Sequence, residues 1–306
     1  MTKKIFYSLL LTFGAAFVAQ AQQESQYTQY MYNTMLFNPA YTGSRDVPSV
    51  FGLFRAQWVG FEGAPTNGNI SYHQPLKGKF SNVGLGGTVF HEKIGIEKKT
   101  DVTVDFSYTL KFEKSKLAFG ISGSANLFDI NYGELSLSQP LDPNLTGTEN
   151  VFSPNLGAGI YWYTNRSYIG FSVPNLLETS HYKAGNVSVL KNAQHLYLIG
   201  GYVFNLSPNT KFKPAFLTKM VTGAPLQVDV SANFLFNDKF TLGAAWRWDS
   251  AASLMAGFQI NERWFIGYAF DYETTPLAKY NSGSHEVFLR FELVQLYKEV
   301  LSPRFF

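Results

Sequence analysis

From about residue 49 onward, the hydrophobic pattern of the chain has a period of two. In the stretch 101–112 apolar and polar side chains alternate without a fault, and the apolar face consists of Val102, Val104, Phe106, Tyr108, Leu110 and Phe112. The stretch 226–237 repeats this pattern, and only Leu235 breaks it. Such alternation is typical of β-strands with one apolar and one polar face. The chain is therefore expected to be all-β.

Fourteen segments of this kind can be counted along the chain. They lie at roughly 50–58, 66–74, 82–91, 100–112, 117–127, 154–163, 167–174, 194–204, 210–220, 226–236, 240–249, 252–260, 263–272 and 284–294. An even number of strands is what a closed bacterial outer-membrane barrel needs. The pattern predicts a transmembrane barrel of about fourteen antiparallel strands over residues 49–294.

The connections between the segments alternate in length. With a periplasmic start, the inner turns are short and fall at 75–81, 113–116, 164–166, 206–209, 237–238 and 261–263. The outer connections include the long stretches 128–153, 175–193 and 273–283. Outer-membrane barrels have short periplasmic turns and longer extracellular loops. The alternation of short and long connections therefore favours a barrel over a soluble sandwich.

Composition also indicates a membrane environment. The chain is 17% aromatic and only 15% charged, whereas soluble domains average roughly 25% charged residues. No run of 18 apolar residues follows Val18, so a mature chain that spans a membrane must do so as strands. Aromatic residues near predicted strand ends suit an interfacial girdle, and they are Trp58, Tyr161, Trp162, Tyr163, Trp246, Trp248, Trp264 and Tyr272.

The first residues indicate export. Lys3 and Lys4 precede an apolar run at 5–18 and an A-x-A pattern at 19–21, which predicts a signal peptide over residues 1–21. Its removal leaves 23 basic residues against 22 acidic ones, a net charge of about +1, and nothing here suggests nucleic acid. The absence of cysteine excludes lipoprotein anchoring, disulfides and thiolate metal sites.

Candidate catalytic and metal chemistry is weak. The five histidines, His73, His91, His181, His195 and His285, form no HExxH, GxSxG or Asp-His-Ser pattern, so no enzyme and no cofactor is predicted. The stretch 142–150 places Asp142, Asn144, Thr146 and Gly147 as in an EF-hand loop. Its twelfth position is Ser153 instead of Glu, so an ordinary turn is the preferred interpretation over calcium binding.

The polar faces of the strands carry charges of both signs. They are Asp101, Asp105, Lys111, Lys211, Lys213, Lys219, Asp229, Arg247, Asp249, Asp271, Glu286, Arg290 and Glu292. Because the signs are interspersed, we expect ion pairs and hydrogen bonds in the lumen and no strong single-sign field.

The stretch QYTQYMYNTMLFNPAYTGSRD (26–46) precedes the first strand and lies within a predicted N-terminal segment, 22–48. It is expected to start on the periplasmic side, where it is either a simple lead-in or a plug or floor of the lumen. The candidate plug or docking residues are Gln26, Tyr27, Gln29, Tyr30, Met31, Asn33, Asn38, Pro39, Tyr41 and Gly43. Glycines at 83–87 and 120–123 suit inward positions where something packs closely.

Several motifs together resemble a known family. They are QYTQYMYNTMLFNPAYTGS (26–44), RAQWVGFEGAPTNGNISYHQPL (55–76), VGLGGTVFHEKIG (83–95), GFSVPNLL (170–177) and SPRFF (302–306). The sequence resembles the PorP/SprF family of the Bacteroidetes type IX secretion system. The most specific pairing joins the first motif to QWVGFEGAP, which contains Gln57, Trp58, Gly60, Phe61, Gly63 and Pro65.

The resemblance implies a non-enzymatic outer-membrane component of the secretion and gliding machinery. Its implied partners are the lipid bilayer, periplasmic ring or peptidoglycan-linked components, and a secreted adhesin with a type B C-terminal sorting domain. We hypothesise that the adhesin binds outer-loop residues, namely Asp142, Asn144, Glu149, Asn175, Glu178, His181, Tyr182, Glu273 and Tyr280. The alternative function is a passive diffusion porin or substrate channel. The tail 295–306 is expected to lie in the periplasm.

Overall fold

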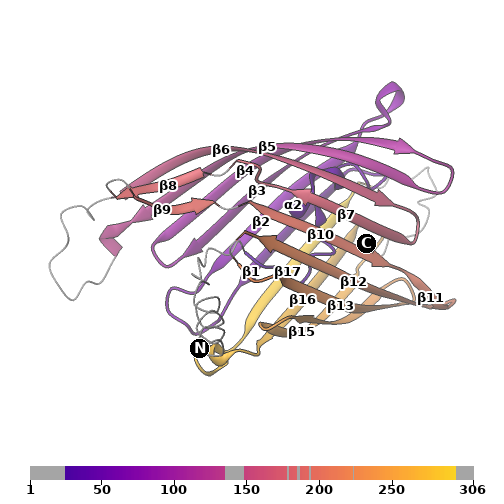
Figure 1. The fold of residues 1–306 in the computed structure, drawn as a ribbon. Coiled ribbons are helices and arrows are strands. Elements are labelled where there is room, and N and C mark those ends of the chain that lie inside the picture. The colour runs from indigo at the N-terminus through magenta and orange to yellow at the C-terminus, as the bar shows by residue number, and fades with distance from the viewer. Residues whose placement is uncertain are drawn as a thin grey trace, which may run out of the picture.

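The strands close into a single antiparallel barrel. The structure, a computed structural model, describes residues 25–134, 148–177, 179–184, 187–192, 194–222 and 224–293. Each barrel strand pairs with its neighbours along the chain, and β1 pairs with β17 to close the sheet (Figure 1). The predicted signal peptide, 1–21, and the predicted tail, 295–306, lie outside the described residues.

The barrel wall has fourteen strands, as the sequence predicts. They are β1 (Ser49–Ala56), β2 (Thr66–Pro75), β3 (Val83–Ile94), β4 (Glu97–Lys111), β5 (Lys116–Asn131), β6 (Thr148–Tyr163), β7 (Ser167–Val173), β10 (His195–Tyr202), β12 (Thr210–Val221), β13 (Gln227–Phe236), β14 (Phe240–Arg247), β15 (Ala251–Gln259), β16 (Trp264–Glu273) and β17 (Ser284–Glu292). A short strand, β11 (Phe204–Ser207), continues β10 along β12 and is counted with it.

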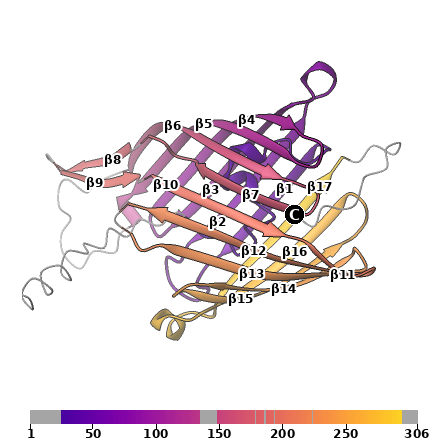
Figure 2. The ribbon, with the colours of Figure 1, turned by 45° about the vertical axis from the view of Figure 1, so that its right-hand side comes forward.

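The two ends of the barrel differ in the length of their connections. The inner end carries the short turns 112–115, 164–166 and 237–239, and a 3-10 helix, η2 (Gly78–Phe80), follows β2 there. The outer end carries the connection 57–65, the connection 274–283 with η4 (Pro276–Lys279), and a hairpin of β8 (Thr179–Ala184) and β9 (Val187–Asn192) (Figure 2). Short periplasmic turns identify the inner end as periplasmic.

Not every outer connection is long. β3 and β4 are joined by residues 95–96 alone, and the predicted loop 128–153 is partly strand. β5 runs to Asn131 before η3 (Tyr132–Glu134), and β6 begins at Thr148. β5 and β6 are longer than predicted, because their backbone groups stay hydrogen-bonded to each other beyond the residues in which apolar and polar side chains clearly alternate.

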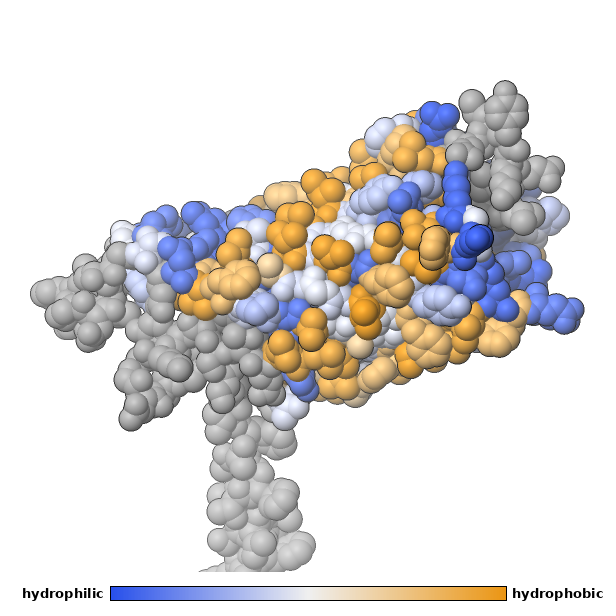
Figure 3. Space-filling model, turned by 90° about the horizontal axis from the view of Figure 1, so that it is seen from above, coloured by the Kyte–Doolittle hydropathy of each residue, from blue (hydrophilic) through white to orange (hydrophobic). Residues whose placement is uncertain are grey.

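The outward face of the wall is apolar. The alternating residues of β4 are exposed as predicted, with Val104 at 66% and Phe106 at 41%. Figure 3 shows one side of this apolar band, with hydrophilic residues gathered toward both ends. Trp162 and Trp264 face outward, but Tyr161 and Tyr163 are buried inside the barrel, because side chains alternate between the two faces of one strand. Assigning these two tyrosines to the girdle was therefore wrong.

The N-terminal segment lies inside the barrel. We call residues 25–46 the lumen segment; it contains the short helix α2 (Thr34–Phe37) and the 3-10 helix η1 (Pro39–Tyr41). Almost all its side chains from 27 to 42 are buried, and α2 is visible between the walls in Figure 1. No helix in the described part of the chain has both the length and the apolar character needed to cross a bilayer.

Candidate functional site

The lumen segment runs the length of the barrel from the outer end to the inner end. Near its start, Gln26 Nε2 donates to Gln227 Oε1 at 2.8 Å, and Gln227 is the first residue of β13. Near its end, Asp46 Oδ1 lies 3.2 Å from Lys116 Nζ, at the inner end of β5. The expectation that the segment begins on the periplasmic side was therefore wrong. The alternating up-and-down direction of the strands determines that β1 begins at the inner end. It does not restrict the path of the chain before β1.

Two wall carboxylates hold the outer part of the lumen segment. Glu286 accepts hydrogen bonds from the backbone N–H groups of Thr28 (3.1 Å) and Gln29 (2.9 Å). Asp271 Oδ1 accepts from the Thr28 hydroxyl at 2.6 Å. Arg55 lies between the two carboxylates, 2.7 Å from Asp271 and 3.2 Å from Glu286, and all three side chains are at least 97% buried. This cluster therefore binds both the backbone of the segment and the Thr28 side chain, and the Gln29 side chain adds a hydrogen bond from Nε2 to the Glu286 carbonyl at 3.4 Å.

Side-chain hydrogen bonds attach the middle of the segment to two opposite walls. The amides of Asn33 and Asn69 exchange two hydrogen bonds, at 3.0 and 3.2 Å. The Tyr30 hydroxyl lies 3.2 Å from Ser231 Oγ on β13. A buried amide without a partner costs about 1–3 kcal/mol, so these contacts offset the loss of water around the segment.

Aromatic packing holds the same region. The Tyr32 ring packs against Phe265 and Phe288, with centroids 5.5 and 5.0 Å away, and Lys213 Nζ lies 4.7 Å from its centroid. Tyr32 therefore contacts side chains from three wall strands, β12, β16 and β17.

The inner part of the segment is turned by Asn38. Its Oδ1 accepts from the backbone N–H of Ala40 at 2.9 Å, and its Nδ2 donates to the Ile160 carbonyl at 3.1 Å. The chain then passes so close to β5 that a Cβ atom on Gly120 would collide with the backbone of Pro39 and Ala40. Glycine is therefore required at this point of the wall.

A second close approach joins Gly43 to Gly84 on β3. Gly43 has φ +72°, a left-handed conformation, and a Cβ there would meet the Gly84 backbone. The Gly43 N–H donates to His73 Nδ1 at 3.1 Å, which assigns His73 a structural role. Arg45 then pairs with Glu292.

Replacing Arg55 by Met is expected to lower the free energy of unfolding by about 3–5 kcal/mol, because it leaves Asp271 and Glu286 buried without their cation. The measurement is denaturant unfolding of the barrel in detergent, followed by tryptophan fluorescence. Lys211→Met is the control, because Lys211 pairs with Asp238, whose side chain is 49% exposed, and should cost no more than about 1 kcal/mol. Equal losses in both variants would contradict the role of the cluster.

The predicted family motif residues form part of a second feature, at the outer end. Trp58 donates its indole N–H to Glu273 at 3.0 Å. The backbone of Val59 donates to the Gly283 carbonyl and accepts from the Ser282 N–H, both at 2.8 Å. These bonds join residues 57–65 and 274–283 into one unit, which we call the outer-loop surface. It exposes apolar side chains, namely Val59 (38%), Phe61 (47%), Leu277 (37%) and Tyr280 (68%).

The other predicted partner-binding residues are distributed differently. Asp142, Asn144 and Glu178 lie outside the described residues, as does the calcium-like pattern at 142–147. Glu149 lies in β6, and His181 and Tyr182 lie in β8, whereas Asn175 lines a cavity in the lumen. Glu273 ends β16 and is 8% exposed. Its carboxylate binds Trp58 and Thr275, so Glu273 supports the outer-loop surface from below.

Sequence reasoning missed two residues that hold the lumen segment. Thr28 lies between candidate residues of the same motif, and Arg55 is the first residue of the motif 55–76, but neither was singled out. A charged residue at an inward position of the first strand was the available signal for Arg55.

The predicted calcium pattern is described only at its twelfth position, Ser153, which is buried in β6. Within the described ranges, no three acidic or histidine side chains are placed to bind a metal ion.

These features define an outer-membrane β-barrel whose lumen contains its own N-terminal segment. The chain belongs to the family described as type IX secretion system membrane protein PorP/SprF, which it matches over residues 19–291. It is therefore a membrane component of type IX secretion. A comparison with curated proteins gives no match.

Solved structures with a similar fold are outer-membrane barrels. A Pseudomonas aeruginosa FadL homologue is 10% identical, with 84% of this chain and 93% of that chain covered and a TM-score of 0.50. The Ralstonia pickettii toluene transporter TbuX is 10% identical, with coverage of 85% and 92% and a TM-score of 0.51. The CymD monoaromatic hydrocarbon channel is also 10% identical, with coverage of 88% and 94% and a TM-score of 0.50. At this identity the likeness concerns the fold alone.

Proposed function

We propose that the barrel is a closed, non-enzymatic accessory of type IX secretion that holds a secreted protein at its outer end. The observation that carries this proposal is the lumen segment, which passes through the whole barrel and is hydrogen-bonded to walls on several sides. A passive porin needs an aqueous passage. Here the segment acts as a plug, and the barrel serves as an anchored platform.

The partner at the outer end is a secreted adhesin, bound through its type B C-terminal sorting domain. The outer-loop surface supports this proposal, because it is tied together by backbone hydrogen bonds and exposes apolar side chains beyond the strands. Exposed apolar patches rimmed by polar residues are typical of protein-binding sites. At the inner end, the short turns are the proposed contact for periplasmic ring or peptidoglycan-linked components, and the predicted periplasmic tail, 295–306, lies outside the described residues.

Replacing Phe61 and Tyr280 together by Asp is expected to reduce the amount of adhesin that co-purifies with a tagged barrel at least roughly ten-fold, as expected for loss of two interface anchors. The readout is quantitative mass spectrometry after gentle extraction from native outer membrane. Phe80→Asp is the matched control, because Phe80 is 65% exposed at the inner end. Undiminished capture by the double variant would contradict this surface, and deletion of 141–149 then tests the predicted long loop.

The alternative function is a passive channel, and conductance distinguishes it from a closed accessory. The intact protein in a planar bilayer is expected to show no steady open current. A large steady current from the intact chain would favour a diffusion porin or substrate channel over the proposed function.

A further inference from the structure

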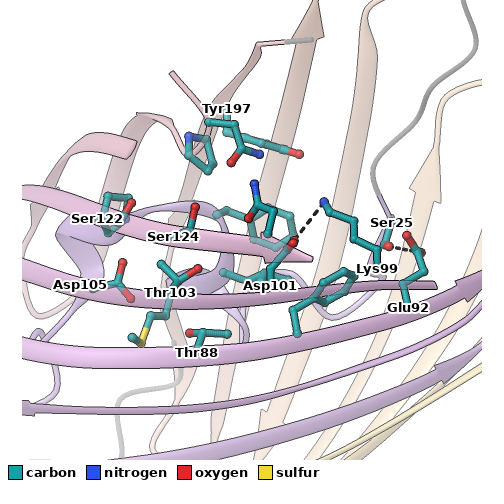
Figure 4. Close-up of a pocket in the computed structure, with 18 of the residues that line it drawn as sticks. Ser25, Thr88, Glu92, Lys99, Asp101, Thr103, Asp105, Ser122, Ser124 and Tyr197 are labelled. Carbon is teal, nitrogen blue, oxygen red and sulfur yellow. Dashed lines mark hydrogen bonds and ion pairs between the residues drawn. The ribbon is translucent and has the colours of Figure 1, made fainter. Parts of the chain in front are cut away.

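A cavity of about 100 Å³ lies inside the barrel, between the lumen segment and the wall formed by β3, β4 and β5. Ser25, Glu92 and Lys99 lie toward its outer side, and Asp105 and Ser122 lie deeper (Figure 4). Phe37 and Pro39 of the lumen segment line it as well. A cavity of this size holds several water molecules, so a small group can enter.

The cavity contains more negative than positive charge. Three carboxylates line it, those of Glu92, Asp101 and Asp105, and Lys99 is its one lining cation among the described residues. Lys99 Nζ lies 3.0 Å from Asp101 Oδ2 and is therefore engaged near the outer rim. Glu92 accepts a hydrogen bond from Ser25. Both interactions are drawn in Figure 4. No cation of the described lining faces Asp105.

Asp105 is the buried carboxylate of this cavity that lacks a hydrogen-bond partner on one oxygen. Its side chain is inside the wall of β4, the residue is 3% exposed, and its Oδ2 has no hydrogen-bond partner among the described residues. A buried, uncompensated carboxylate is strongly disfavoured. A bound cation or hydrogen-bond donor would therefore stabilise the charged form of Asp105.

Two neutral hydroxyl groups beside Asp105 are unsatisfied as well. Thr88 Oγ1 and Ser124 Oγ are buried without hydrogen-bond partners in the described part of the chain, and both residues line the cavity. Thr88 pairs with Thr103 on β4, and Thr103 pairs with Ser124 on β5. Asp105 lies two residues further along β4, on the same face, so the carboxylate and both hydroxyls border one space.

We propose that this cavity binds a primary ammonium group with Asp105 as its counter-ion, in a space that the hydroxyl groups of Thr88 and Ser124 also line. An ammonium has three N–H donors and no acceptor, and the carboxylate and hydroxyl oxygens left without partners here can all accept. The aliphatic stem lies against Phe37 and Pro39. The group enters from the outer end, either on a free alkylamine or on a lysine side chain of a bound polypeptide.

The test is calorimetric titration of the full-length barrel in detergent with n-butylammonium, and separately with a short peptide containing one lysine. Saturable binding of n-butylammonium is expected, and Asp105→Asn should weaken it roughly ten-fold or more, because it removes a charge-assisted hydrogen bond. Asp249→Asn is the matched control, because Asp249 is exposed at the outer end, and it should leave binding unchanged. Asp105→Asn keeps the shape of the side chain and removes a buried charge, so the variant is expected to fold.

Tetramethylammonium separates hydrogen bonding from charge alone, because it has no N–H group. Equal binding of tetramethylammonium and n-butylammonium would overturn the proposal, as would equal binding by the Asp105→Asn variant or no saturable binding at all. Binding of both the amine and the peptide assigns the site to a lysine of a partner polypeptide. Binding of the amine alone assigns it to a free alkylamine. The proposal does not depend on the adhesin, so a failure of adhesin capture leaves this result unaffected.

Discussion

A single cysteine introduced at Gln26 is expected to react with a membrane-impermeant maleimide added to intact cells. Gln26 lies at the outer end of the lumen, bonded to Gln227 at the start of β13, although it precedes a strand that begins at the inner end. The side chain is partly exposed. Labelling from outside would place the start of the lumen segment on the cell surface, beside the outer-loop surface.

The native chain contains no cysteine, so each variant carries one thiol and needs no background correction. Tyr280→Cys, on the outer-loop surface, is the positive control, and Lys239→Cys, in the turn 237–239 at the inner end, is the negative control. Labelling of Gln26→Cys only after the outer membrane is permeabilised, like Lys239→Cys, would show that the segment does not cross the lumen in the cell.

Deletion of residues 26–44 is expected to convert a closed barrel into a conducting one, or to destabilise it so that it unfolds at lower temperature. The segment lies inside the lumen, and its removal leaves Asp271 and Glu286 without the Thr28 and Gln29 donors. Planar-bilayer conductance and thermal unfolding in detergent measure the two outcomes. A deletion variant that stays closed and as heat-stable as the intact chain would refute the plug.

A point variant tests whether the lumen segment follows the path described here, close to β5. Gly120→Leu places a side chain where the Pro39 and Ala40 backbone passes, and it should cost about 1–3 kcal/mol through overpacking or displace the segment. Gly123→Leu, three residues along β5, is the matched control, because a Cβ on Gly123 meets nothing within 4 Å. Gly123 is exposed on the lipid side, so the control should behave like the intact chain.

The barrel could be predicted because each strand carries its own local signal. A membrane-spanning strand must be apolar on one face, and this requirement produces the alternation seen in 101–112 without reference to any other strand. The exposure of Val104 and the burial of Asp105 follow from that alternation alone. The strand ends were less predictable, since β5 and β6 extend by backbone pairing, which is independent of side-chain type.

The candidate site was predictable only in part. The lumen segment stood out because its aromatic and amide residues suit neither a strand nor an unstructured tail, and the wall glycines indicated close packing. The direction in which the lumen segment runs could not be deduced, because no local sequence pattern indicates at which end of the barrel a segment before β1 begins. The ion cluster of Arg55, Asp271 and Glu286 brings together positions more than 200 residues apart in the sequence.

The sequence by itself therefore determined the class of protein, the number of strands, the two faces of the most regular strands and the family, because each depends on local alternation or on a contiguous motif. Only the tertiary structure decided that Gln26 lies at the outer end, that Glu273 supports Trp58 beneath the outer-loop surface, and that Asp105 borders a cavity beside Thr88 and Ser124. These features depend on closure of the barrel around its own N-terminal segment, which brings together side chains from distant strands.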